Sequence, residues 1–121
     1  MRIGIVTGEF PPLAGGVGDY SRQLAQALAA QNVDVHVITD LRCLGGPAAG
    51  FTLHPVIRRW SFPALWQVRS LARRLDLAWL NIQYQAAAYG LGAPIHFLPD
   101  AAGVPAIVTF HDLRVPYLFP K

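Results

Sequence analysis

Short apolar runs rich in β-branched residues alternate with helical patterns along this chain of 121 residues. The apolar runs fall at residues 2–7, 33–39, 51–57, 77–84 and 105–110, and the helical patterns at about 17–31, 61–75 and 94–102. Strands that alternate with helices are joined by right-handed crossovers and form a parallel sheet. The sequence therefore predicts an α/β fold, a Rossmann-like three-layer αβα sandwich with strand order 3-2-1-4-5.

The helical segments carry recognisable start and stop residues. Tyr20, Leu24 and Leu28 recur at helical spacing and predict one apolar face of the first helix, and Asn32 is a predicted left-handed stop. Ser61 is a predicted N-cap of the second helix. Pro55, inside the third apolar run, predicts that this strand lies at an edge of the sheet.

The second helix is predicted to be amphipathic, with Pro63 in its first turn and a basic outer side. Its apolar residues predict the core face: Phe62, Leu65, Trp66, Val68, Leu71 and Leu75. Five arginines, with no acidic residue among them, lie in or just before this helix: Arg58, Arg59, Arg69, Arg73 and Arg74. Such a segment is typical of a solvated helix face, and the alternative is peripheral contact with an anionic membrane. No known nucleic-acid-binding module is recognisable, so no nucleic-acid partner is predicted.

Composition excludes several classes of protein. Hydrophobic residues make up 53% of the chain and charged residues 14%, which excludes a disordered tail, a coiled coil and a charged linker. Cys43 is the single cysteine, and no Cys/His cluster has metal-ligand spacing, so no metal site is predicted. No apolar run is long enough for a signal peptide or a membrane span, and we expect a cytoplasmic protein.

Glycines precede the first helix, at Gly15 and Gly16. A glycine loop at a helix N-terminus favours an anion, and a phosphate is the natural ligand. The dinucleotide-binding fingerprint needs its glycines directly after the strand, whereas residues 8–14 intervene here. Asp40, at the end of the second strand, is placed like the acid that binds a ribose in that fingerprint.

Two segments resemble glycosyltransferase family 4. The first runs RIGIVTGEFPPLAGGVGDYSRQLAQALAAQNVDVHVIT from Arg2, and the second is VTFHDL at residues 108–113. The resemblance implies a retaining enzyme of GT-B fold that transfers a sugar from a nucleotide-sugar. A UDP- or GDP-sugar would be the co-substrate, with no further cofactor.

The resemblance also implies roles for individual residues. Gly15 and Gly16 match the glycine loop beside the donor diphosphate, and His111 matches the active-site histidine near the anomeric centre of the transferred sugar. Contacts with the acceptor, which can be a lipid, a glycan or a small molecule, are implied for Asp19, Gln83, Tyr84 and Asp112.

One departure from the family pattern bears on domain organisation. A GT-B enzyme has a second Rossmann-like domain that binds the donor and carries paired glutamates, whereas Glu9 is the only glutamate here. We therefore expect residues 1–121 to be an incomplete N-terminal, acceptor-side domain, inactive without its donor-binding partner domain. A stand-alone nucleotide- or phosphate-binding module and a non-catalytic interaction domain remain alternatives.

Overall fold

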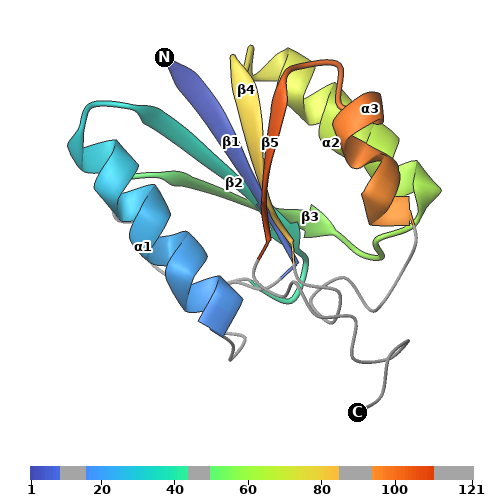
Figure 1. Cartoon of the computed structure of the whole chain (residues 1–121), viewed down its shortest axis with the longest axis horizontal. Helices are drawn as coiled ribbons and strands as arrows, with labels where there is room; N and C mark the ends of the chain where they lie inside the picture. Colours follow the sequence, from blue (N-terminus) through green and yellow to red (C-terminus); the bar gives the residue numbers. More distant parts are fainter. Residues whose placement is uncertain (9–15, 44–49, 85–93, 111–121) are drawn as a thin grey trace.

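The computed structural model of this protein describes residues 1–8, 16–43, 50–84 and 94–110. In chain order its elements are β1 (Arg2–Thr7), α1 (Gly16–Ala30), β2 (Asp34–Asp40), β3 (Thr52–Ile57), α2 (Phe62–Arg74), β4 (Trp79–Tyr84), the 3-10 helix η2 (Pro94–Phe97), α3 (Leu98–Ala101) and β5 (Ala106–Phe110). The strands form one parallel sheet in the order β3-β2-β1-β4-β5. Helix α1 covers one face of this sheet, and α2 and α3 cover the other (Figure 1). The predicted three-layer, Rossmann-like α/β fold is confirmed.

Alternation along β1 supplies both hydrophobic cores. Ile3 and Ile5 pack on the α1 side with Val35 of β2, whereas Val6 and Ile38 pack on the α2 side. All five side chains are at most 1% exposed. Burial of one such aliphatic side chain stabilises a fold by about 1.5–3 kcal/mol, so the central strands hold the two helical layers on the sheet.

Helix α2 begins where the sequence predicts. Ser61 has extended backbone angles, φ −105° and ψ 176°, and Pro63 lies in the first turn. Within the described residues, the Ser61 side chain makes no capping hydrogen bond. The core side of the helix consists of Ala64, Leu65, Val68, Leu71 and Ala72.

Two other local predictions are confirmed. β3, with Pro55 inside it, lies at an edge of the sheet, where a missing backbone N–H costs least. Asn32 adopts φ +64° directly after α1, the left-handed conformation expected of a stop residue. The other strand ends and the ends of α1 and α2 differ from the predicted ones by at most two residues, as helix and strand ends commonly do. The single helix predicted over residues 94–102 is instead the 3-10 helix η2 followed by the short helix α3.

The prediction that Phe62 and Trp66 belong to the core is wrong. Phe62 is 54% exposed and Trp66 is 61% exposed. At 3.6 residues per turn, both fall on the helix side that carries Arg69 and Arg73, opposite the buried side. Tyr20 of α1, predicted to share the face of Leu24 and Leu28, is also half exposed.

Candidate functional site

The strand order places a topological switch point at β1. This strand pairs with β2 on one side and with β4 on the other, and Thr7 at its carboxyl end lies opposite Gln83 of β4. In open parallel sheets, ligands bind outside the carboxyl ends of the strands at such a point. The edge formed by β1, β4 and β5 is therefore the candidate site.

Helix α1 starts on the same side, because it follows the carboxyl end of β1. Gly16 is its first residue, and Asp19 lies exposed in its first turn. The free N–H groups at the start of a helix of 15 residues, together with its dipole, favour an anion. Gly15, His111 and Asp112 lie outside the described residues.

A layer of polar side chains lies in the sheet near this edge. The amide Nδ2 of Asn81 donates to Oγ1 of Thr109 at 3.2 Å, and Nε2 of Gln83 donates to Oδ1 of Asn81. Thr7 and Gln83 are fully buried, and so is Ser21 on the facing side of α1. Buried amides must be hydrogen-bonded, so this network ties the ends of β4 and β5 together.

The two predicted acceptor residues of β4 differ in their surroundings. Gln83 is fully buried and belongs to the polar layer. Tyr84 is half-buried and packs against the core under α2, next to Ile82. Because side chains alternate along a strand, the two residues point to opposite faces of the sheet. Sequence reasoning did not identify Asn81 or Thr109, since a hydrogen bond between neighbouring strands depends on their register.

The carboxylate of Asp40, at the carboxyl end of β2, is hydrogen-bonded to Arg42. Its Oδ1 accepts from the backbone N–H of Arg42 at 2.8 Å and from Nε at 2.9 Å, while Oδ2 accepts from Nη2 at 3.2 Å. The hydrogen bond and the negative charge of Asp40 raise the pKa of Arg42. A carboxylate with these donors is poorly placed to bind a ribose, which weakens the comparison with dinucleotide-binding domains.

A histidine pair lies near the amino ends of β2 and β3, away from the candidate site. Nδ1 of His36 is 3.0 Å from Nε2 of His54, and the rings are stacked with centroids 5.2 Å apart. Nε2 of His36 lies 3.2 Å from Oδ1 of Asp34, within ion-pair distance but without hydrogen-bond geometry. Burial, followed by the charges of His36 and Arg74, lowers the pKa of His54. Within the described residues, no group of three or more His, Cys, Asp or Glu side chains is arranged to hold a metal ion.

On the predicted basic side of α2, Arg73 and Arg74 in the last turn are exposed, whereas Arg69 is half-buried. Arg58 and Arg59, just before the helix, are exposed as well. Across the ranges that the structure describes, no helix combines the length and apolar character needed to cross a membrane.

Comparisons with known proteins identify similar folds and the family of this chain. The C-terminal domain (residues 78–226) of a hydrogenase from Pyrococcus furiosus is similar, with a TM-score of 0.50 and 16% identity over 88% of each chain. The solution structure of a phosphate-loop protein matches with a TM-score of 0.45 and 14% identity, over 97% of this chain and 84% of that one. The first likeness reflects a shared fold alone, and no curated protein sequence matches the chain. Residues 14–121 match the family described as Glycosyltransferase Family 4. The match extends over most of the chain, which therefore belongs to glycosyltransferase family 4.

Proposed function

We propose that this chain is the acceptor-side domain of a retaining glycosyltransferase of GT-B fold. The enzyme would move a sugar from a UDP- or GDP-sugar to an acceptor. One observation carries the proposal: the family match runs over residues 14–121, from just before α1 through β5. The switch point of the sheet lies at β1 and β4, and α1 starts on the same edge. The hydrogen-bonded polar layer of Asn81, Gln83 and Thr109 supports the proposal, because it would hold the strand ends beside a bound sugar in place.

The start of α1 is proposed to face the donor diphosphate. Gly15 and Gly16 carry no side chain, so the phosphates can approach the backbone N–H groups closely. Asp19, exposed in the first turn, is proposed to accept a hydrogen bond from a hydroxyl of the acceptor. The oxygen atoms of its carboxyl group are suitable acceptors for such a hydroxyl.

His111 is proposed to serve the reacting centre. It follows Thr109 by two residues, and the bond from Asn81 to Thr109 holds β5 in place just before it. A neutral imidazole can donate to a sugar hydroxyl and stabilise the charge that develops near the anomeric carbon. Asp112 and Tyr84 are proposed to contact the acceptor, and Gln83 would act from within the polar layer by supporting that edge.

The donor base and sugar are proposed to be bound by a second Rossmann-like domain, and transfer would need both domains. A nucleotide-sugar donor and the single buried cysteine, Cys43, are consistent with a cytoplasmic enzyme. The engagement of Asp40 by Arg42 favours this proposal over an autonomous dinucleotide-binding module.

The test combines calorimetry with a transfer assay. The chain of 121 residues should show no tight binding of UDP- or GDP-sugars by itself, and transfer should appear only in a polypeptide that also carries the donor-binding domain. There, His111→Ala should lower kcat by about 10²-fold or more. His54→Asn is the matched control, because His54 lies away from the candidate site, and it should leave kcat unchanged. NMR of the first product should show retained anomeric configuration. Tight nucleotide-sugar binding by the short chain, or full activity of His111→Ala, would overturn the proposal.

A further inference from the structure

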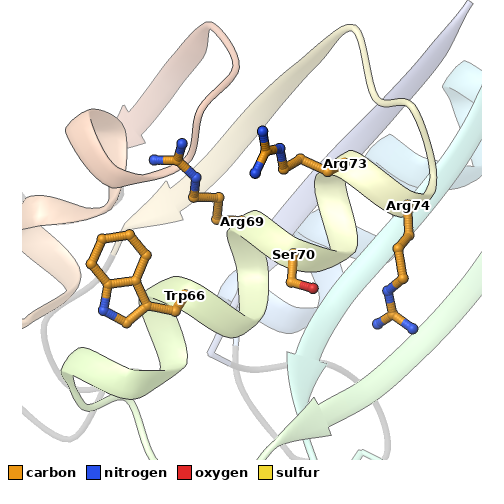
Figure 2. A pocket seen from close by; sticks show the side chains of 5 residues that line it. All are labelled: Trp66, Arg69, Ser70, Arg73 and Arg74. Carbon is orange, nitrogen blue, oxygen red and sulfur yellow. The ribbon is translucent and has the colours of Figure 1, made fainter.

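The outer side of α2 carries a stripe that changes character along its length. Phe62 and Trp66 occupy its first half, and Arg69, Arg73 and Arg74 occupy its second half. Residues three or four positions apart lie above one another on a helix, so Phe62, Trp66, Arg69 and Arg73 form one continuous row. Ser70 lies beside this row. The surface there forms an open hollow of about 860 Å³, and the residues that line it are Trp66, Arg69, Ser70, Arg73 and Arg74 (Figure 2).

Three aromatic side chains are exposed at the first end of this row. Phe62 is 54%, Trp66 is 61% and Phe97 of η2 is 52% exposed. The rings of Phe62 and Phe97 contact each other, with centroids 5.7 Å apart and an angle of 41° between their planes. A cluster of large aromatic rings on the surface is typical of an interaction site rather than of a solvated helix face. It lies at the end of α2 that follows the carboxyl end of β3, toward the edge of the candidate site.

Among the residues that the structure describes, the arginines in and just before α2 have no acidic partner. Within the described ranges, no ion pair includes any of Arg58, Arg59, Arg69, Arg73 or Arg74, whereas Arg2 pairs with Asp34 and Arg42 with Asp40. Helix α2 contains no acidic residue, and Asp100 on neighbouring α3 forms no ion pair with them. The positive charge of this face is therefore available to an external anion.

Arg69, the arginine nearest to the aromatic rings, is half-buried and is held against the protein surface beside them. The Cζ atom of Arg69 lies 5.8 Å from the centre of the Trp66 ring, and Nη1 donates to the carbonyl of Ala101 at 3.5 Å. Arg69 also lies over Gly103, where an added Cβ would meet its Nε at 3.5 Å. Figure 2 shows Arg69 and Arg73 extending to the same side of α2, and Arg74 extending to the other side.

We propose that this face, formed by Phe62, Trp66, Phe97, Arg69 and Arg73, docks the protein on a membrane that contains anionic lipids. The aromatic rings would enter the headgroup boundary, while the guanidinium groups would bind lipid phosphates. Two features favour a lipid surface over a nucleic acid. Phe62 and Phe97 pack against each other instead of standing apart for bases to stack on, and the aromatic and basic ends are separated along the helix. The proposal is independent of the sugar-transfer chemistry.

Flotation with lipid vesicles tests the proposal on the full chain. Vesicles of equal parts phosphatidylglycerol and phosphatidylcholine should bind the protein at least about tenfold more tightly than vesicles of phosphatidylcholine alone. High salt should weaken this binding, because screening reduces the attraction between the arginines and the lipid phosphates. Trp66 fluorescence should shift to the blue on binding, and the shift should be absent in Trp66→Phe.

Matched double variants distinguish the effect of this face on vesicle binding from the effect of net charge alone. Arg69→Gln combined with Arg73→Gln should weaken binding about tenfold or more, since each basic residue near an anionic surface contributes about fivefold. Arg22→Gln combined with Arg42→Gln removes the same charge from α1 and the end of β2 and should change binding far less. Circular dichroism should show all variants folded, because the substituted side chains lie outside the core.

Three results would overturn the proposal. These are equal affinity for the two vesicle types, equal losses in the two double variants, and binding to a single-stranded RNA oligonucleotide that is tighter than binding to the anionic vesicles. The last result would favour a nucleic-acid partner instead.

Discussion

Nδ1 of His36 and Nε2 of His54 lie 3.0 Å apart, so one imidazole donates to the other across β2 and β3. This bond requires one of the two facing nitrogens to be unprotonated. Adding a proton to His54 would break the arrangement and place a second charge near Arg74. Protonation of this pair at low pH is therefore expected to lower the free energy of unfolding.

This pair predicts how stability depends on pH. Because the folded-state pKa of His54 is lowered by burial and by His36 and Arg74, the unfolded chain binds its proton more readily. The contribution of His54 is fully present above the unfolded pKa of about 6.5 and is lost as pH falls below it, by at most about 1.4 kcal/mol per pH unit. Urea unfolding between pH 5 and pH 8 should show this slope and a smaller slope in His54→Gln. A parallel loss of stability in parent and variant would contradict the assignment.

Gly4 of β1 predicts a packing penalty. A Cβ at this position would lie 2.5 Å from Cδ2 of Leu80 and 2.7 Å from Cδ1 of Leu77, both of which are buried. Gly4→Ala should lower the free energy of unfolding by about 1–3 kcal/mol. In a thermodynamic cycle, Gly4→Ala with Leu80→Val should cost less than the sum of the single changes, because the shorter side chain makes room. Strict additivity would show that the clash is not the cause.

The bond between Asn81 and Thr109 predicts which substitutions loosen β5. Thr109→Val keeps the shape but removes the acceptor for Nδ2 of Asn81, which is only 9% exposed. We expect a loss of about 1–3 kcal/mol in unfolding free energy and faster amide hydrogen exchange in β5. Thr109→Ser restores the hydroxyl and should recover most of the loss. Equal effects of valine and serine would assign the cost to the methyl group instead.

Asp40 and Arg42 form one ion pair, but we expect their replacement by alanine to lower the free energy of unfolding by unequal amounts. The Arg42 side chain is 71% exposed, so Arg42→Ala should lower the free energy of unfolding only slightly. Asp40 is buried, and Asp40→Ala also removes the acceptor for the backbone N–H of Arg42, so about 1–3 kcal/mol should be lost. Thermal unfolding of both variants tests this difference. Equal losses would mean that the exposed guanidinium, not the turn, carries the stabilisation.

Most of the fold follows from local signals. The short β-branched runs, the edge proline Pro55 and the stop residue Asn32 each act through a few neighbouring residues, and all three predictions are confirmed. Phe62 and Trp66 were assigned to the core from their apolar character alone. Their spacing to Arg69 and Arg73 indicates the exposed side of α2 instead, because residues three, four or seven positions apart share one helix side.

The candidate site was less accessible to sequence reasoning. Gln83 lies at the predicted strand end, but its full burial depends on what packs around β4. The bond from Asn81 to Thr109 depends on the pairing of β4 with β5, which fixes which side chains become neighbours. Long-range relationships of this kind leave no periodic pattern in the chain.

The central place of β1 has a consequence for biosynthesis. During translation β1 leaves the ribosome first and can pair with β2 soon afterwards, yet its other edge must wait until Trp79–Tyr84 have been made. The sheet thus grows outward in two stages, first toward β3 and then toward β5. Closing the second stage brings distant parts of the chain together, and pairings between distant segments generally form more slowly than local ones. Until then the nascent chain presents an unpaired strand edge to chaperones and to other nascent chains.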